Sequence, residues 1–325
     1  MPTVLVTGGA GYIGSHTTLA LTQAGYDVIV YDNLSTGRAE AVLPPARLVV
    51  GDLAETAKLA TLMAESRFTA VLHFAGSIIV PESVENPIKY YKNNTTNTTA
   101  LVELALRHRI PHFIFSSTAA VYGIPKTVPV TEDAPTAPIN PYGRSKLMSE
   151  WTIFDAAAAH PHFRPVVLRY FNVAGADPGG RLGQCTPQAT HLIKVAAQTA
   201  LGRREALSIF GTDYPTPDGT CIRDYIHVTD LAEAHVRALR HLEGGGAPGV
   251  FNCGYGHGYS VREIIAAMQA AIGHTFAVRT APRRAGDPPA LVADSTRIQR
   301  VMSWQPKHDC IEEIVKSAYL WEQRL

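Results

Sequence analysis

Near the start of the chain stands the run Val4-Leu5-Val6-Thr7-Gly8-Gly9-Ala10-Gly11-Tyr12-Ile13-Gly14, in which a short apolar segment leads into glycines at a G-x-x-G-x-x-G spacing. A segment with helical periodicity follows. In a strand–turn–helix unit, Gly8 permits a tight turn, Gly11 lets the backbone approach a pyrophosphate, and Gly14 lets helix and strand pack closely. The N–H groups at the start of the helix then favour phosphate oxygens. Because a plain strand-to-helix turn also explains a glycine motif taken alone, the following residues must decide its meaning.

Two acidic residues after the next apolar runs support a dinucleotide site. Asp32 ends the second run, 18 residues after Gly14, where the ribose hydroxyls of NAD require a carboxylate. That carboxylate would repel the additional phosphate of NADP, so NAD is preferred, although Arg38 lies nearby. Asp52 and Leu53 follow the third run and are predicted to hold the adenine end. The alternative for Asp52 is an N-cap of the next helix.

Apolar runs that alternate with segments of helical length organise the first half of the chain. Continuously apolar strands separated by helices are typical of a parallel sheet covered on both faces. The sequence therefore predicts an α/β fold with a Rossmann-type doubly wound parallel sheet over residues 1–172. The strands are expected at Val4–Val6, Val28–Tyr31, Leu48–Val50, Val71–Phe74, Phe113–Phe115 and Val166–Arg169.

After Asn172 the expected strands become short, at Ser208–Phe210 and Val250–Asn252, and glycine- and proline-rich loops separate them. A length of 325 residues suits one large unit with a smaller second one. Residues 173–325 are therefore predicted to form a smaller C-terminal α+β lobe. Its helices are expected near Thr229–Leu242, Ser260–Ile272 and Cys310–Gln323.

The segment Pro81–His108 is predicted to be helical, with a break or kink at Pro87. Its centre, Asn93–Thr99, consists of asparagine and threonine, which are poor helix formers. Contacts from outside the segment must therefore hold it.

Composition excludes several classes of partner. With 29 basic and 28 acidic residues, the formal net charge of +1 provides no general attraction to nucleic acid or to an anionic membrane. The four cysteines are widely spaced, without metal-ligand spacing, so no metal and a reducing compartment are expected. No run approaches the ~20 apolar residues of a membrane span, and no export signal is evident. A cytoplasmic location is expected.

A tyrosine and a lysine four residues apart suggest proton transfer. Tyr142 and Lys146 begin a helical pattern after Pro141, and their spacing places both on one face. A phenol is a poor base near neutral pH unless a cation stabilises the phenolate. A Y-x-x-x-K pattern alone is common on solvated helices, but here Ser116-Ser117-Thr118 also emerge at the carboxyl end of a strand, where α/β folds place ligands. Capping of a helix or turn is the alternative role of these hydroxyls.

With these features in place, the chain resembles the UDP-galactose 4-epimerases, which are extended short-chain dehydrogenases/reductases. The resemblance runs from about Val4 to Ala293. Its motifs are Thr7–Gly14, Asp32–Asn33, His73–Gly76, Phe113–Gly123, Tyr142–Lys146, Arg169–Gly175, Cys221–Val228 and Ala281–Asp287.

The resemblance implies an NAD-dependent inversion at C4 of a UDP-hexose, interconverting UDP-glucose and UDP-galactose. Tyr142 would take the proton of the C4 hydroxyl while a hydride passes to nicotinamide, and Thr118 and Lys146 would orient and tune the phenol. The 4-keto sugar would then turn over and receive the hydride on its other face. NAD would therefore stay tightly bound as a prosthetic group.

The resemblance also implies two sets of binding residues, and a homodimer formed through the helices at Pro81–His108 and Tyr142–His160. In the substrate set, Arg223 and Arg284 would hold the diphosphate. The cofactor residues are Gly8, Gly11, Tyr12, Ile13, Gly14, Asp32, Asn33, Asp52, Leu53, Phe74, Ala75, Gly76, Asn93, Ser116, Tyr142, Lys146 and Tyr170. The substrate residues are Thr118, Tyr142, Phe171, Asn172, His191, Leu192, Phe210, Arg223, Tyr225, Arg284, Asp287 and Leu291.

Four positions depart from the family's common pattern or vary within it. Thr118 stands where a serine is frequent, and Ile78 where many relatives place a lysine that touches the cofactor. His191 replaces a common asparagine, and an ordinary interior histidine is its alternative. Leu291 occupies the position that limits the C2 substituent of the sugar. Because leucine is intermediate in size, UDP-N-acetylhexosamines and UDP-pentoses stay open as substrates.

Two other functions compete with the epimerase interpretation. A sugar-nucleotide 4,6-dehydratase would share the fold and the Y-x-x-x-K pattern, but it places an Asp-Glu pair where this chain has Ala119 and Ala120. A non-catalytic NAD-binding sensor would not need Tyr142 or Lys146. The epimerase interpretation is therefore preferred.

Overall fold

The computed structural model describes residues 1–186, 189–284 and 287–325. Ala285 and Gly286, which belong to the motif Ala281–Asp287, lie outside the described residues. The centre of the molecule is a seven-stranded parallel sheet with the strand order β11-β6-β5-β4-β1-β2-β3. Its strands are β1 (Thr3–Thr7), β2 (Asp27–Asp32), β3 (Arg47–Val50), β4 (Phe68–His73), β5 (His112–Thr118), β6 (Arg164–Tyr170) and β11 (Gly249–Cys253).

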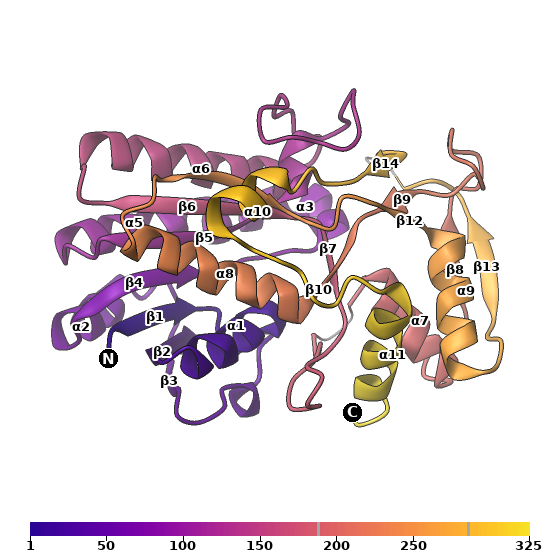
Figure 1. Ribbon diagram of the computed structural model, residues 1–325, viewed down its shortest axis with the longest axis horizontal. Helices are drawn as coiled ribbons and strands as arrows, with labels where there is room; N and C mark the ends of the chain where they lie inside the picture. Colours follow the sequence, from indigo (N-terminus) through magenta and orange to yellow (C-terminus); the bar gives the residue numbers. More distant parts are fainter. Residues whose placement is uncertain (187–188, 285–286) are drawn as a thin grey trace.

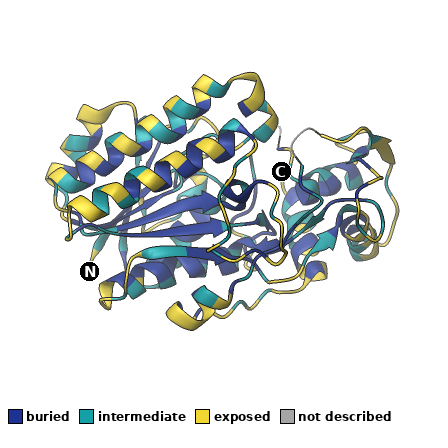
Figure 2. Ribbon diagram, turned by 90° about the horizontal axis from the view of Figure 1, so that it is seen from above, coloured by how far each residue is buried: buried dark blue, intermediate teal, exposed yellow. Residues whose placement is uncertain are grey.

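Helices cover both faces of this sheet, as Figure 1 shows, and the predicted doubly wound α/β fold is confirmed. Buried strand side chains alternate between two apolar cores, one on each face. In Figure 2 the buried sheet lies between helices whose outer surfaces are exposed. Helices α1 (Tyr12–Gln23) and α8 (Val228–Glu243) cover one face, and α2 (Thr56–Glu65), α5 (Asn97–Arg107) and α6 (Pro141–Ala159) cover the other.

The order of the strands reverses between β1 and β4, because β1 pairs with β2 on one side and with β4 on the other. At such a switch point, consecutive crossovers pass to opposite faces and leave a crevice outside the carboxyl ends of the strands. The carboxyl ends of β1, β4, β5 and β6 therefore meet at one edge of the sheet. This edge carries most of the residues that the sequence singled out.

The smaller unit lies beyond that edge and has its own apolar core beneath three helices. It contains two small sheets, β13-β8 and β12-β9-β14, and the pair β10-β7 connects it to the main sheet. Its strands are β7 (Asn172–Ala174), β8 (Leu207–Phe210), β9 (Ile222–Arg223), β10 (Tyr225–His227), β12 (Tyr259–Ser260), β13 (Val278–Ala281) and β14 (Ala290–Leu291). The helices are α7 (Leu192–Ala200), α9 (Val261–Ile272) and α11 (Ile311–Glu322), and α10 (Thr296–Met302) packs near β11.

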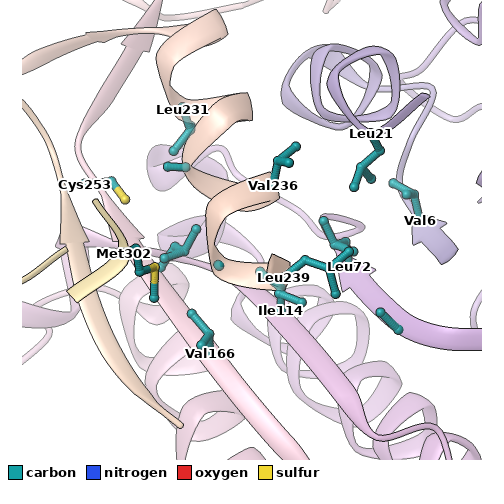
Figure 3. Close-up of a cluster of buried hydrophobic side chains, with 14 of the residues drawn as sticks. Val6, Leu21, Leu72, Ile114, Val166, Leu231, Val236, Leu239, Cys253 and Met302 are labelled. Carbon is teal, nitrogen blue, oxygen red and sulfur yellow. The ribbon is translucent and has the colours of Figure 1, made fainter. Parts of the chain in front are cut away.

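One strand expected in the smaller lobe belongs to the main sheet instead. The strand predicted at Val250–Asn252 is β11, which pairs in parallel with β6 and forms the edge of the large sheet. Helix α8 precedes it and supplies Leu231, Val236 and Leu239 to the core below β4, β5 and β6, as Figure 3 shows. This strand was misplaced because a short apolar run does not reveal which sheet it joins. The division at residue 172 stays a prediction.

The segment expected to be helical over Pro81–His108 consists of four pieces. Helix α3 (Val80–Glu85) ends just before Pro87, which confirms the predicted break, and α4 (Pro87–Tyr90) follows it. Of the poor helix formers, residues 93–96 belong to a π-helical turn, η2 (Tyr91–Thr96), and residues 97–99 begin α5. None of the helices in the described ranges combines the length and the apolar content that crossing a bilayer requires.

Contacts from outside hold the π-helical turn, as the sequence required. The amide of Asn94 donates to Ser145 Oγ and to the Ser77 carbonyl, both at 3.0 Å, and its oxygen accepts from the Ser77 N–H at 2.8 Å. Thr95 donates to the Ser145 carbonyl at 3.0 Å. The turn is therefore fixed between helix α6 and the loop that follows β4.

Candidate active site

A single cleft of about 1320 Å³ lies between the carboxyl edge of the main sheet and the smaller unit. It is lined by all the predicted cofactor and substrate residues except Ser116 and Lys146, which are buried. The structure therefore brings together residues that lie up to 283 positions apart, from Gly8 to Leu291. Many are on short loops that follow strands.

The glycine turn forms one end of the cleft. Gly8 has a positive φ of 74°, and a Cβ atom there would lie 2.5 Å from the backbone nitrogen of Ala75. A Cβ atom on Gly14 would lie 2.2 Å from the Gly8 carbonyl oxygen, so α1 could not approach β1. Gly11 is the N-cap of α1, and no side chain caps the helix. The first N–H groups of α1 are therefore available at a cleft wall without side-chain bulk, which suits the pyrophosphate of a dinucleotide.

The carboxylate of Asp32 organises the backbone around the glycine turn. It accepts hydrogen bonds from the N–H groups of Ala10 at 3.0 Å and Leu34 at 2.8 Å. Asn33 donates to Asp52 Oδ2 at 2.6 Å, so a second carboxylate lies at the same end of the cleft. Two carboxylates at this end disfavour an additional phosphate on the ribose.

The N-cap alternative for Asp52 is wrong. Glu55 holds the N-cap position of α2. Asp52 instead accepts from the Ala54 N–H at 2.8 Å, within the preceding turn. Its side chain is therefore part of the cleft wall rather than of the helix start.

Tyr142 and Lys146 lie in the first two turns of α6, as the sequence predicted. Asn140 caps this helix by accepting from the Gly143 N–H at 2.8 Å, and Pro141 occupies the first turn. The Lys146 Nζ atom donates to the Ser116 carbonyl at 2.9 Å and lies 4.7 Å from the centre of the Phe115 ring. The carboxyl end of β5 and the start of α6 are thereby joined directly.

Burial shifts the pKa values of Tyr142 and Lys146 in opposite directions. Burial raises the pKa of Tyr142, although a hydrogen bond with Thr118 works against this. Burial lowers the pKa of Lys146 to about 8, and the carboxylate of Glu150 opposes that shift. Tyr142 is therefore a neutral phenol at pH 7, and additional positive charge beside it is needed before it becomes a base.

Hydroxyl groups surround the phenol. Ser116 Oγ and the Tyr170 hydroxyl lie 2.5 Å apart at the ends of the neighbouring strands β5 and β6. Thr118 Oγ1 accepts from the Ala120 N–H at 3.1 Å, so it caps the turn η3 (Ala119–Tyr122) as well as bonding to Tyr142. The capping role and the role in the site are therefore combined in Thr118.

Two guanidinium groups lie at the other end of the cleft, on the smaller unit. Arg223 Nη2 lies 3.7 Å from Asp287 Oδ1. The guanidinium of Arg284 stacks over the Phe210 ring, with 3.9 Å from its Cζ atom to the ring centre. Stacking holds a guanidinium without consuming its N–H donors, which stay available for phosphate oxygens.

His191, whose role the sequence left open, forms a side-chain hydrogen bond and also lines the cleft. His191 Nδ1 lies 2.9 Å from the amide nitrogen of Gln184, and burial lowers the pKa of His191. A neutral imidazole therefore lines the cleft beside Leu192. Leu291 lies on β14 next to Arg223 of β9, and it belongs to the same apolar cluster as Ala119 and Phe171.

Sequence reasoning missed several residues of the cleft. Lys89 and Asn97 line it together with Asn93, and their spacing of four residues to Asn93 was a usable signal. Others lie on loops or on a short strand of the smaller unit, where periodicity carries little information. They include Ser77, Ile79, Gln184, Thr190, Ser208 and Cys221.

Comparison with known proteins agrees with this geometry. Residues 4–254 match the model of the NAD dependent epimerase/dehydratase family. The chain belongs to this family. The UDP-glucose 4-epimerase of Azospirillum brasilense is 58% identical over 100% of this chain and 93% of its own length.

Solved structures are similar along the whole chain. The UDP-glucose 4-epimerase from Brucella ovis, in complex with NAD, is 46% identical with a TM-score of 0.95 and 98% coverage of both chains. The UDP-Glc/GlcNAc 4-epimerase from Campylobacter jejuni is 51% identical with a TM-score of 0.88 and 100% coverage of both. The family resemblance inferred from the motifs is thus confirmed.

Proposed function

We propose that the chain interconverts UDP-glucose and UDP-galactose by inverting C4, with tightly bound NAD. The observation that carries this proposal is one continuous cleft. It joins an uncapped helix start, a buried Tyr142–Thr118–Lys146 group and the guanidinium groups of Arg223 and Arg284. The cleft therefore has anion-binding groups at both ends and a proton-transfer group between them.

The dinucleotide is held by the first half of the chain. The N–H groups of α1 suit its pyrophosphate, and Asp32 and Asn33 suit the adenosine ribose. The chemistry that NAD would supply when bound is to take a hydride from C4 and to return it to the ketone. Lys146 supplies positive charge close to Tyr142, and Thr118 donates to the phenol oxygen or accepts from it.

In the proposed reaction, Tyr142 accepts the proton of the C4 hydroxyl as C4 becomes a ketone. Returning this proton after the sugar has presented its other face completes the inversion. No net oxidation occurs, so the cofactor has no reason to leave the cleft between turnovers. Retention of NAD distinguishes this proposal from an ordinary dehydrogenase.

The UDP part of the substrate belongs to the smaller unit in this proposal. Arg223 and Arg284 bind the diphosphate, and Phe210, Tyr225 and Asp287 line the cleft beside them. The Phe171, Asn172, His191, Leu192 and Leu291 side chains border the sugar. The first unit, residues 1–172, would then hold the cofactor, and residues 173–325 the substrate.

A homodimer is supported by an exposed apolar surface on the predicted helices. Val84, Ile88, Met148 and Trp151 lie on α3, α4 and α6 and are exposed by 62%, 60%, 40% and 58%. Helices α3 and α4 both pack against α6, so these side chains belong to one helical layer. Large apolar residues gathered in this way favour burial against a second copy. The four unpaired cysteines support a reducing compartment, and we propose the cytoplasm.

The decisive experiment uses the protein purified without added cofactor. NAD is extracted and quantified, and UDP-galactose is then incubated with the protein while UDP-glucose is followed by chromatography. Co-purified NAD and equilibration of the two sugars without external cofactor support the proposal. If only UDP-N-acetylhexosamines or UDP-pentoses are converted, the proposed substrate is wrong and the 4-epimerase activity stands. If NAD is bound but no sugar nucleotide is converted, a non-catalytic NAD-binding sensor is favoured.

A further inference from the structure

A buried ion pair lies behind the wall of the cleft, between Glu150 of α6 and Arg169 of β6. The two side chains are only 2% and 7% exposed. Arg169 Nη2 lies 2.6 Å from Glu150 Oε2, and Arg169 Nε lies 3.1 and 3.2 Å from the two carboxylate oxygens. Burying two charges costs solvation energy that apolar side chains would not cost. Stability alone therefore does not explain why this ion pair is buried.

The pair fixes the end of β5 to α6. Glu150 lies one turn after Lys146 on the same helical face. Its carboxylate accepts a hydrogen bond from Ser117 Oγ. Ser117 stands between Ser116, whose carbonyl accepts from Lys146, and Thr118, which bonds to Tyr142. The position of β5 relative to α6 therefore depends on Glu150.

Arg169 holds the segment on the other side of Thr118. Its Nη1 donates to the Tyr122 hydroxyl at 3.0 Å, and its guanidinium lies 4.9 Å from the centre of the Tyr122 ring. The Tyr122 hydroxyl donates to Asn252 Oδ1 of β11 at 2.7 Å. Because Tyr122 ends the turn η3 that begins after Thr118, the backbone is anchored both before and after that threonine.

Glu150 also supplies negative charge near Lys146. The titratable groups around Lys146 and Tyr142 are His73 on β4, Tyr90 on α4, Arg169 and Tyr170 on β6, and Glu150 on their own helix. Glu150 is the carboxylate of this set. Its attraction favours the charged form of Lys146, whereas burial opposes that form.

We propose that Glu150 and Arg169 are positioning residues, which hold Thr118 and Lys146 in place beside Tyr142, and that the Glu150 carboxylate keeps Lys146 protonated. This inference rests on the proposed function for its kinetic readout. Glu150→Gln removes the charge and keeps the shape, whereas Glu150→Asp keeps the charge and shortens the reach. The two variants therefore separate electrostatics from geometry.

For Glu150→Gln, kcat near pH 8 is expected to fall by about tenfold, because less of Lys146 is charged and an uncharged lysine does not stabilise the phenolate of Tyr142. The KM for UDP-galactose should stay close to that of the parent. Loss of the carboxylate should also move the alkaline limb of the kcat profile to lower pH. Glu150→Asp should lose kcat while keeping the alkaline limb of the parent.

A matched control is Glu322→Gln. This variant breaks the equally buried pair of Glu322 and Lys194, which joins α11 to α7 in the smaller unit. It should lower the melting temperature without moving the alkaline limb. A Glu150→Gln protein with lower melting temperature, but with the kcat and alkaline limb of the parent, would show a merely structural pair and overturn the proposal.

The lysine titration is also measurable without turnover. NMR of protein labelled at the lysine Cε carbon, assigned with Lys146→Met, should show Lys146 losing its proton at lower pH in Glu150→Gln than in the parent. An unchanged titration would overturn the electrostatic role. If the parent itself is inactive, the proposed function fails, and this titration still tests the charge of Glu150.

Discussion

The Nζ atom of Lys146 donates a hydrogen bond of 2.9 Å to the carbonyl oxygen of Ser116 and lies behind the wall of the cleft. The lysine is only 4% exposed, whereas Tyr142, one turn earlier, lines the cleft. The ammonium group is therefore fixed to the backbone of β5. Lys146 therefore acts on Tyr142 through the positive charge that it holds at a fixed position, one helical turn away.

Activity should decrease as pH rises through about 8. Burial lowers the pKa of Lys146 to about 8, so the lysine is charged below this pH and neutral above it. Only the charged form stabilises the phenolate of Tyr142. A profile of kcat for UDP-galactose from about pH 6 to about pH 10 measures this limb. In Lys146→Met activity should be low throughout, and a limb identical to that of the parent would assign it to another group.

Tyr142→Phe should lower kcat by about 10²–10⁴-fold, the usual contribution of general acid–base catalysis. Because the ring stays and the phenylalanine still packs against Tyr90, bound NAD and melting temperature should match those of the parent. Extraction of NAD and single-turnover assays distinguish loss of chemistry from loss of cofactor. Activity equal to that of the parent would refute the role of this phenol.

Two glycine variants should fail in different ways. Gly14→Ala places a methyl group 2.2 Å from the Gly8 oxygen, and this overpacking should cost about 1–3 kcal/mol of unfolding free energy in urea titrations. In Gly11→Ala the nearest atom is the same oxygen at 3.3 Å, a contact that a shift of a few tenths of an ångström relieves, so the loss of stability should be smaller. That protein should instead lose bound NAD during purification, because the methyl group stands at the phosphate end of the cleft. Equal NAD content in the parent and Gly11→Ala would place the pyrophosphate elsewhere.

The cofactor-free protein should lose stability in acid below pH about 6.5, the pKa of an unfolded histidine. Burial lowers the pKa of His73 to about 3 and that of His235 to about 4. The unfolded chain therefore binds protons that the folded chain refuses, and stability decreases from about pH 6.5 towards the folded values. Melting temperatures across this range measure the slope. His235→Gln should flatten it, whereas His274→Gln, at an exposed site, should leave it unchanged.

Leu291→Tyr should narrow the range of accepted sugars. Leu291 is 8% exposed and lines the cleft, so a larger ring would occupy the space beside the sugar. Discrimination against UDP-N-acetylglucosamine relative to UDP-glucose should increase by about 1–3 kcal/mol in kcat/KM. If the ratio of the kcat/KM values for the two substrates equals that of the parent, another residue sets the size limit.

The sequence predicted the parts of the molecule that local chemistry determines. The turn from Thr7 to Gly14, the strands of the first half and the start of α6 at Pro141 were recognisable because spacing, caps and periodicity act over a few residues. The π-helical turn at Tyr91–Thr96 was not foreseen, because Ser77 and Ser145, which hold it, lie far away in the sequence. The poor helix propensity of the segment indicated only that contacts from elsewhere in the chain must hold it.

The smaller unit was predicted less well for the same reason. Gln184 and Ser208 line the cleft although neither belongs to a motif, and only tertiary contacts place them there. The ion pair of Glu150 and Arg169 joins a helix to a strand, and neither residue's spacing suggested a partner. Long-range pairing is decided by the topology of the sheet rather than by neighbouring residues.

The edge position of β11 has a consequence for biosynthesis. The main sheet cannot be completed until Gly249–Cys253 has left the ribosome, although β6 has been available since Tyr170. In the meantime β6 presents an unpaired edge, which is a template for pairing with other chains. A nascent chain stalled between these two points, or a fragment ending at residue 172, is therefore expected to be prone to aggregation.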